Sequence, residues 1–267
     1  MSLPAFALLE VRRDGDLLWV TLDNPAKANA LSPAMAAEVR ALYRHDWRAE
    51  GVRAILLNGA GKHFCAGADL DHLVSLQNAG PEDNRRDSAA MQELFAAILY
   101  QPALTVALVH GSCVAGGCGI ATAHDYVIGT ADSRYLYSEV RIGFVAALVA
   151  TFLPLRVKGR DLRELLLDPQ FIDAANALEI GLINRVEPGN SPEALVEAGR
   201  ELVAGLLERA SSESIARTKG LLLDALGRPL AEAMERAAEV NAASRATADC
   251  KHGIATFLAT KKPPLWR

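Results

Sequence analysis

The sequence lacks the features of membrane, disulfide-rich and nucleic-acid-binding proteins. No apolar run reaches the roughly 20 residues that cross a bilayer, and the first residues lack a basic segment followed by an apolar one. Four cysteines form neither a CxxC pair nor a regular framework, as expected of reduced thiols in a cytoplasm. The net charge of -4 comes from interspersed charges, so no broad basic field favours nucleic acid. We therefore expect a cytoplasmic protein with neither a membrane nor a nucleic-acid partner.

Two classes of cofactor site also lack support. The six histidines occur without HExxH or another metal-ligand spacing, so ordinary structural roles explain them better. The glycines of Gly116-Gly117-Cys118-Gly119 lack the GxGxxG spacing and the early βαβ placement of a dinucleotide site. We predict no metal and no dinucleotide cofactor.

What is present is a chain with 51% hydrophobic residues, enough to bury a full core. Apolar and β-branched runs predict strands over residues 6–11, 17–22, 52–57, 105–109 and 126–128. Helical spacing predicts helices from Ser32-Pro33 to near Gly51, over 69–77 and over 88–100. Strands that alternate with helices predict an α/β fold with crossover connections.

After residue 145 the pattern becomes almost entirely helical. Amphipathic segments predict helices near 160–167, 192–209, 213–226 and 229–248. The turn Gly189-Asn190-Ser191-Pro192 is the clearest interruption, because Gly and Asn favour turns and Ser-Pro favours a helix start. We expect an α/β core over residues 1–190 and a helical C-terminal region over residues 191–267.

Two segments of small residues each follow a strand and precede a helical pattern. They are His63–Leu70 and Gly111–Gly119. Backbone N–H groups are free at a helix start, so each turn is able to bind an oxygen anion. For either segment alone, close packing is the more common role of small residues at such a turn. Together they predict one pocket built from two turns.

The order of these segments along the chain resembles the crotonase family, also called the enoyl-CoA hydratase/isomerase family. Four further segments carry the resemblance: Asn24–Leu31, Ser138–Gly143, Ala177–Val186 and Asp249–Lys261. It implies a repeated ββα core, a helical trimerisation region, and homotrimers or hexamers made of two trimers. It also implies an acyl-CoA thioester substrate, so that coenzyme A enters as part of the substrate rather than as a cofactor.

Carried over by position, the family's two oxyanion donors fall on the backbone N–H groups of Ala68 and Gly116. Removing a proton beside a thioester, or adding a nucleophile to a conjugated thioester, places charge on the thioester oxygen. Prearranged N–H donors stabilise that charge, and one such donor contributes about 2.7–4 kcal/mol to lowering the barrier.

The family's hydratases commonly use two glutamates, and this chain retains one of them. The first falls on Gly119 and the second on Glu139. Burial in an apolar pocket would move the Glu139 carboxyl group toward a useful acid/base range, whereas a surface salt bridge is its ordinary alternative. The segment 143–150 also departs from the Pro-Gly-rich turn of many hydratases. The segment Ser138–Gly143, together with glycine at 119, shows a modest likeness to bacterial methylglutaconyl-CoA hydratase-type members.

The resemblance also places contacts to coenzyme A. They fall on Lys27, Ala66, Asp69 and Leu70, and on Phe257 and Lys261, the last two often contributed by a neighbouring subunit. Phosphates require cations at the rim of a site. The alternative interpretation is that Lys27 and Lys261 are solvated surface residues.

The leading functional hypothesis is the addition of water to a 2-enoyl-CoA, with Glu139 as acid/base and an enolate held by Ala68 and Gly116. The absence of a carboxylate at Gly119 leaves two alternatives open. One is an enoyl-CoA isomerase that moves a double bond with a single glutamate. The other is a non-catalytic acyl-CoA-binding protein that kept the fold.

Overall fold

A six-stranded sheet forms the centre of the computed structural model, which describes residues 5–77 and 79–266. In sheet order its strands are β1 (Leu9–Asp14), β2 (Leu17–Leu22), β3 (Ala54–Gly59), β4 (Leu104–Val109), β6 (Tyr126–Thr130) and β9 (Arg185–Glu187). The pair β1–β2 is antiparallel, and every following pair is parallel. The α/β prediction with crossover connections is confirmed.

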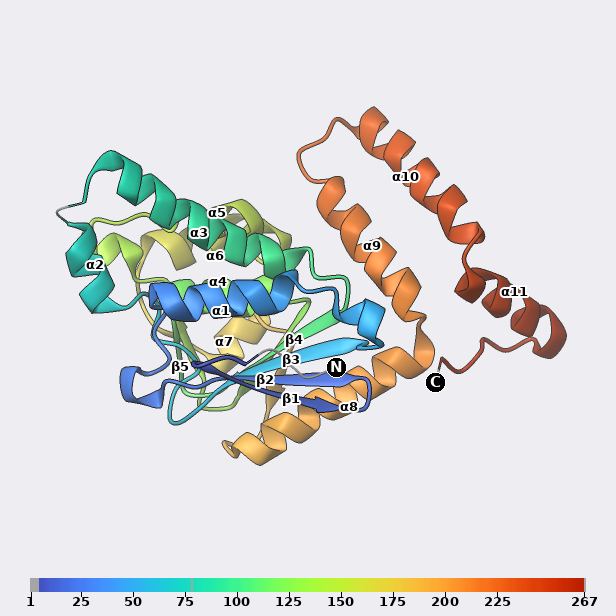
Figure 1. Cartoon of the computed structure of the whole chain (residues 1–267), viewed down its shortest axis with the longest axis horizontal. Helices are drawn as coiled ribbons and strands as arrows, with labels where there is room; N and C mark the ends of the chain where they lie inside the picture. The colour runs from blue at the N-terminus through green and yellow to red at the C-terminus, as the bar shows by residue number, and fades with distance from the viewer. Residues whose placement is uncertain (1–4, 78, 267) are drawn as a thin grey trace.

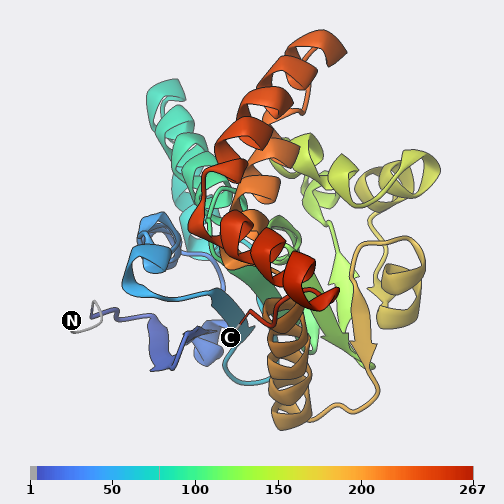
Figure 2. The same cartoon turned by 90° about the vertical axis from the view of Figure 1, so that its right-hand side faces the viewer.

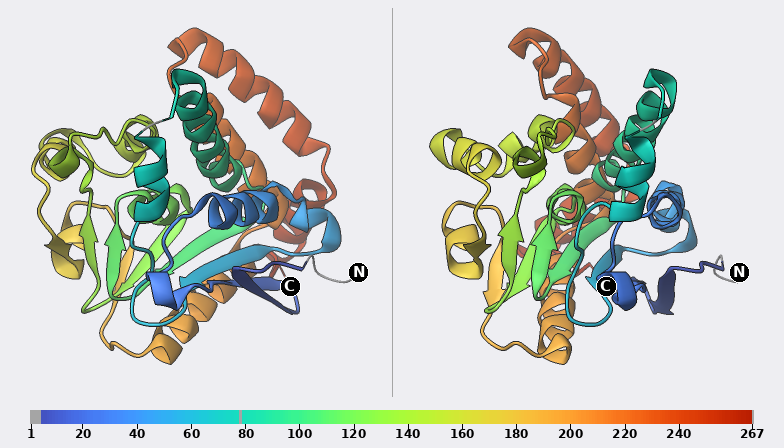
Figure 3. Two further views of the ribbon diagram at one scale, coloured as in Figure 1. Left: turned by 60° about the vertical axis from the view of Figure 1, so that its left-hand side comes forward. Right: turned by 90° about the vertical axis from the view of Figure 1, so that its left-hand side faces the viewer.

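Helices cover both faces of this sheet, which explains why β4 is buried along its whole length. On one face lie α1 (Pro33–Arg44), α3 (Pro81–Leu99) and α4 (Gly116–Ala123), and on the other lies α8 (Pro192–Arg209) (Figures 1 and 3). Helix α8 contributes Leu195, Val203 and Leu207 to a core shared with the sheet. The division at residue 190 stays a prediction, and the first helix beyond it packs on the α/β core.

A second, smaller sheet consists of β5 (Ser112–Val114), β7 (Arg134–Leu136) and β8 (Ile172–Asp173). Two isolated parallel bridges, Leu31 to Ala68 and Cys65 to Cys113, join neighbouring segments to this layer. The chain passes from β4 into β5 and then into α4, which is one ββα unit of the expected core. The sequence did not predict these strands, because two or three residues are too few to show a period.

Shorter helices complete the core. They are α2 (Leu70–Leu76), α5 (Val149–Phe152), α6 (Gly159–Leu167) and α7 (Ala174–Glu179), with 3-10 turns η1 (Pro25–Lys27), η2 (Trp47–Glu50), η3 (Glu139–Ile142) and η4 (Leu153–Leu155). Two predictions were wrong here. The first helix ends at Arg44 rather than near Gly51, because His45 is extended and η2 follows. The chain after residue 145 also contains the strands β8 and β9.

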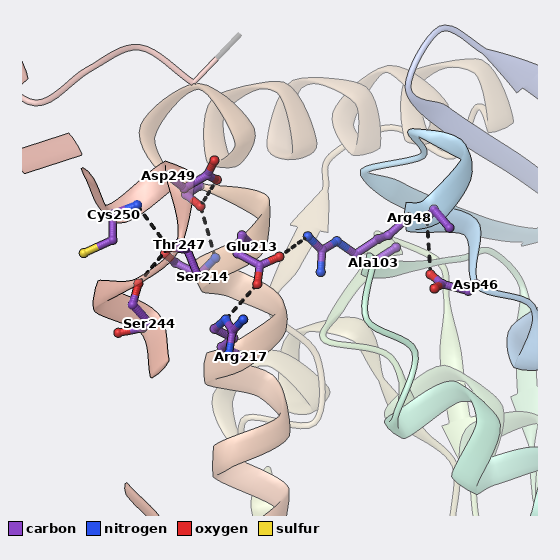
Figure 4. Close-up of polar contacts among 12 residues, drawn as sticks. Asp46, Arg48, Ala103, Glu213, Ser214, Arg217, Ser244, Thr247, Asp249 and Cys250 are labelled. Carbon is purple, nitrogen blue, oxygen red and sulfur yellow. Dashed lines mark hydrogen bonds and ion pairs between the residues drawn. The ribbon is translucent and has the colours of Figure 1, made fainter. Parts of the chain in front are cut away.

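Three C-terminal helices project away from the sheet (Figures 1 and 2). They are α9 (Ser212–Asp224), α10 (Leu230–Arg245) and α11 (Ala248–Thr260), the last of which the sequence did not predict. Two side chains attach α9 to the core. Lys219 Nζ lies 2.6 Å from Asp125 Oδ2. Glu213 pairs with Arg48 at 2.6 Å, as Figure 4 shows. Large apolar side chains stay exposed on this arm, among them Leu222, Leu230, Met234 and Phe257.

Within residues 5–77 and 79–266, no helix combines the length and apolar character needed to cross a bilayer. Over the same residues, no group of three or more histidine, cysteine or acidic side chains is arranged to hold a metal ion.

Candidate functional site

The two turns rich in small residues lie side by side. Cys65 N donates to Ser112 O at 3.3 Å, and Val114 N donates to Cys65 O at 2.9 Å. Glycine is required at two points of this contact. A Cβ on Gly67, whose φ is +88°, would lie 2.9 Å from Val114 O, and a Cβ on Gly117 would lie 2.7 Å from Cys65 O. The structure therefore brings together the two segments that the sequence paired.

The N–H group of Ala68 points toward the second turn. Leu31 N donates to Gly67 O at 2.7 Å, and Asp69 N donates to Leu31 O at 3.3 Å, so the Leu31 side of this segment is occupied. The described chain contains no cis peptide bond, and the C=O and N–H of a trans peptide point in opposite directions. Since Gly67 O faces Leu31, the N–H of Ala68 faces away from Leu31, on the side of β5 and α4.

The N–H group of Gly116 lies at the start of α4, and no described residue accepts a hydrogen bond from it. Ala115 O accepts from Gly119 N at 3.1 Å along the helix, so the N–H of the Ala115–Gly116 peptide points out of the helix N-terminus. Ala115 has φ +48° and ψ -119°, a strained conformation for a residue with a side chain. A bond of 2.7 Å from Ala115 N to Leu136 O holds it.

Both N–H groups lie near Leu31. Its backbone pairs with the segment around Ala68, and its Cδ1 lies 3.1 Å from the position of a Cβ on Gly116. We call the N–H groups of Ala68 and Gly116 the donor pair. Ala68 is exposed and Gly116 is partly exposed, so a ligand oxygen is able to reach these residues.

Glu139 follows the strand end that runs beside α4. Its Oε2 is buried, and no hydrogen-bond partner for it exists among the described residues. Desolvation raises the pKa of this carboxyl group, and the backbone N–H groups of Glu139 and Ser138 offset part of that effect. The alternative of a salt-bridged glutamate is not observed within the described chain. A carboxyl group with a raised pKa and one buried oxygen that no described residue hydrogen-bonds is suited to proton transfer.

No side chain extends from α4 at the position of the family's first glutamate. Gly119 is buried, and a Cβ there would lie 2.8 Å from the ring of Phe95 and 3.0 Å from Val149 Cγ2. The space beside Gly119 is therefore filled by the apolar side chains of Phe95 and Val149, and position 119 supplies no carboxylate.

Four of the predicted coenzyme A positions lie close together. Ala66 and Leu70 are exposed, while Asp69 is buried and caps α2 by accepting from Asp71 N and His72 N. Lys27 Nζ lies 2.8 Å from Asp71 Oδ2 and 2.9 Å from Asp69 Oδ2.

These ion pairs change the pKa of Lys27 and that of Asp69. Hydrogen bonds to Asp71 and Asp69 raise the pKa of Lys27 to about 12, and the Lys27 ammonium lowers the pKa of Asp69. Two carboxylates share one ammonium, so this cluster carries a net negative charge. The predicted contact of Lys27 with a coenzyme A phosphate therefore depends on the donor capacity that its ammonium retains.

Phe257 and Lys261 are not near the other predicted contacts within one chain. Both belong to α11 or its end, whereas α2 lies at the opposite side of the molecule (Figure 1). Phe257 is 52% exposed, so its ring is free to contact another molecule.

Asn29 shapes the first turn, a role that the sequence did not predict. Its side chain is fully buried and its Nδ2 donates to Ala60 O and His63 O at 2.9 Å and to Phe64 O at 3.2 Å. Its φ of +56° lies in the left-handed region that asparagine tolerates. That tolerance was the available signal in the sequence, but it does not identify the three carbonyl partners.

Comparisons with known proteins cover nearly the whole chain. The profile of the enoyl-CoA hydratase/isomerase family matches residues 12–267. Over 252 residues the chain is 40% identical to a Thermus thermophilus protein provisionally named enoyl-CoA hydratase, covering 94% of this chain and 97% of that protein. It is 27% identical to the peroxisomal Delta(3,5)-Delta(2,4)-dienoyl-CoA isomerase of Arabidopsis thaliana, with 98% of each chain covered. Pseudomonas aeruginosa AtuE superimposes with a TM-score of 0.89 at 32% identity, covering 97% and 99% of the two chains.

The two sheets, the paired turns and the helical arm define a protein of the crotonase fold class. The chain belongs to the enoyl-CoA hydratase/isomerase family. This family acts on acyl-CoA thioesters, and relatives named as hydratases and as an isomerase are both among those found. The expectation of an enoyl-CoA hydratase or isomerase is confirmed at this level.

Proposed function

We propose that the donor pair holds the thioester oxygen of an enoyl-CoA and that Glu139 moves the proton. The observation that carries this proposal is the buried Oε2 of Glu139, for which the described residues supply no hydrogen-bond partner. As charge develops on the thioester oxygen, two prearranged N–H groups stabilise the enolate without reorganisation. The raised pKa of Glu139 keeps its carboxyl group nearer to the pH at which it exchanges a proton efficiently.

The net reaction that we propose is the addition of water to the double bond of a 2-enoyl-CoA. The water oxygen bonds to C3, one proton of that water passes to Glu139, and Glu139 delivers a proton to C2. The names of the Thermus thermophilus relative and of several structural neighbours support hydration.

Double-bond isomerisation is the second candidate, because Gly119 supplies no second carboxylate. In that reaction Glu139 removes a proton from C2 of a 3-enoyl-CoA and returns it at C4. The double bond moves with no water consumed. A single carboxyl group is sufficient for this shift, and a relative named as a dienoyl-CoA isomerase is consistent with it.

Product identification separates these reactions. The protein is incubated with a 2-enoyl-CoA and, separately, with a 3-enoyl-CoA, and the thioesters are resolved by retention time and mass. Hydration adds the mass of one water to the 2-enoyl substrate, whereas isomerisation changes retention at constant mass. Tight binding without any product over a panel of chain lengths would show a non-catalytic binding protein and refute the proposal.

We further propose that the coenzyme A site is completed by a neighbouring copy of the chain in a homotrimer, or in a hexamer of two trimers. The exposed position of Phe257 on α11, remote from Lys27, supports this arrangement. Sedimentation measures the assembly directly. A Phe257→Ala variant that remains trimeric is expected to raise KM for the thioester, and a fully active monomer would exclude the shared site.

We also propose a cytoplasmic location and a reaction that needs neither a separate cofactor nor a metal. Four free thiols support a reducing compartment such as the cytoplasm. We propose that the enzyme needs no cofactor beyond the coenzyme A of its substrate and no metal. Activity that survives dialysis against a chelator would support this, and activity restored only by an added ion would refute it.

A further inference from the structure

The side of α4 that bears Gly119 is sealed by aromatic packing. Phe95 lies in α3 and is 4% exposed, and its ring packs on that of Phe152 with centroids 5.6 Å apart. The Phe95 ring atoms Cε1 and Cζ lie 2.8 Å from the position of a Cβ on Gly119, and Val149 Cγ2 lies 3.0 Å from it. A contact of 2.8 Å between carbons is well inside van der Waals separation. No side chain enters this space unless Phe95 moves.

The same helix α3 also reaches the donor pair. Met91 precedes Phe95 by one helical turn, so the two share a face. Met91 Cε lies 4.0 Å from the position of a Cβ on Gly116. Helix α3 thus lies along the first turn of α4, from the donor at Gly116 to the filled space at Gly119.

The strand end that carries Glu139 lies along α4 as well. Ala115 N donates to Leu136 O at 2.7 Å, and Tyr137 Oη lies 3.4 Å from Thr122 Oγ1. The first turns of α4 are therefore enclosed by this strand end and by the Phe95 face of α3. Adding water with two acid/base groups requires a second acid/base side chain near Glu139. A side chain at position 119 of α4 would be that second group, but the Phe95 ring fills the space that it would need.

We propose that Phe95 determines the reaction chemistry by occupying the space beside Gly119, so that Glu139 alone carries the proton transfers. This inference rests on the proposed role of Glu139. It makes Phe95 a specificity-determining residue whose size must match the glycine opposite. A chain with a smaller residue at 95 would accept a second carboxyl group at 119 and would divide water activation from proton delivery between two groups.

A packing cycle tests the first half of the proposal. Gly119→Ala is made in the natural chain and in a Phe95→Ala background. Because overpacking a core is destabilising, the methyl group is expected to lower Tm by about 4–8 °C when Phe95 is present and by less than about 2 °C when it is absent. Equal losses in the two backgrounds would overturn the proposal, since Phe95 would then not be what excludes a side chain.

A chemical cycle tests the second half. Phe95→Ala/Gly119→Glu is compared with Phe95→Ala/Gly119→Gln, which has the same shape without acid/base capacity. Hydration of a 2-enoyl-CoA is measured together with solvent deuterium exchange at C2 of butanoyl-CoA, which reports enolate formation alone. The ratio of hydration to exchange is expected to rise about 10-fold or more in the glutamate variant. An equal ratio in both folded variants would overturn the proposal.

The exchange assay also separates this inference from the proposed function. Absent exchange in the natural chain, or exchange that survives Glu139→Gln, would refute the role of Glu139. If exchange depends on Glu139 as expected but the ratio of hydration to exchange is the same with glutamate and with glutamine at position 119, only the role of Phe95 is refuted. If the glutamate variant does not fold, the packing cycle still decides whether Phe95 excludes a side chain.

Discussion

Replacing Glu139 by glutamine keeps the shape of the side chain and removes its capacity to transfer a proton. A positioned acid/base group contributes about 10²- to 10⁴-fold to rate, which corresponds to about 2.7–5.5 kcal/mol of barrier. We expect kcat to fall by this factor. Because the donor pair consists of backbone groups that the substitution leaves in place, KM for the thioester is expected to change little.

The same substitution is expected to affect stability in the opposite direction. Burial raises the pKa of Glu139 above its ordinary value of 4.5, so the folded protein holds this proton more tightly than the unfolded chain. The resulting stabilisation is complete below the ordinary pKa and is lost as pH rises through the folded pKa. Glutamine lacks this dependence, so its advantage in Tm over the natural protein grows from pH 4 to pH 8. Solvent screening of a partly exposed carboxyl group limits the gain to below about 1 kcal/mol.

The assay combines steady-state kinetics with thermal melts at several pH values. Glu82→Gln, which changes an exposed glutamate in the first turn of α3, is the matched control and is expected to alter neither quantity. Two results would refute the reasoning. An undiminished kcat in Glu139→Gln would remove Glu139 from the proton transfer. A Tm difference that shrinks as pH rises would show that the folded site prefers the charged carboxylate.

Three further predictions concern residues that act around the site. Asn29→Ala leaves three carbonyls without their side-chain donor, so kcat is expected to fall about 10-fold or more and Tm to drop, with exposed Asn84→Ala as control. Similar kinetics in the two variants would contradict a positioning role. Lys27→Met is expected to raise KM about 10-fold with kcat nearly constant, and an unaltered KM would remove Lys27 from coenzyme A binding. Lys219→Met removes the ammonium paired with Asp125, whose carboxylate keeps only its hydrogen bonds from Thr105, and calorimetry is expected to show a loss of about 3–5 kcal/mol.

The strands and helices of the core were predictable where the sequence carried a long enough period. The strands β2 and β4 are continuous apolar runs, and Ser32-Pro33 marks the start of α1 as its capping bond to Met35 N confirms. The strand β5 spans three residues, which show no period, and its identity comes from pairing with β7. Short elements of this kind depend on partners that a local pattern does not reveal.

The sequence predicted which backbone groups form the candidate site, but it did not predict the side chains that pack around them. Small residues at Gly67 and Gly117 indicated close approach of two turns, which their contacts bear out. In the sequence, Phe95 is one of several apolar residues at helical spacing, and nothing distinguishes it from the others. Its importance arises because its ring meets Gly119 from another helix, a relation that neither segment shows alone.

The segment from Asn24 to Leu31 carries no acid/base group at the proposed reaction centre, yet it connects both halves of the donor pair. Asn29 fixes the carbonyls that precede Cys65, and Leu31 pairs with the backbone on either side of Ala68. The Leu31 side chain packs beside the second turn, where its Cδ1 lies 3.1 Å from the position of a Cβ on Gly116. Since one segment bonds to the first turn and packs on the second, a shift of that segment displaces the two N–H groups relative to each other. Oxyanion stabilisation depends on donor positions to a few tenths of an ångström. If the donor pair acts as proposed, a displacement of this segment is therefore expected to lower kcat although the segment transfers no proton.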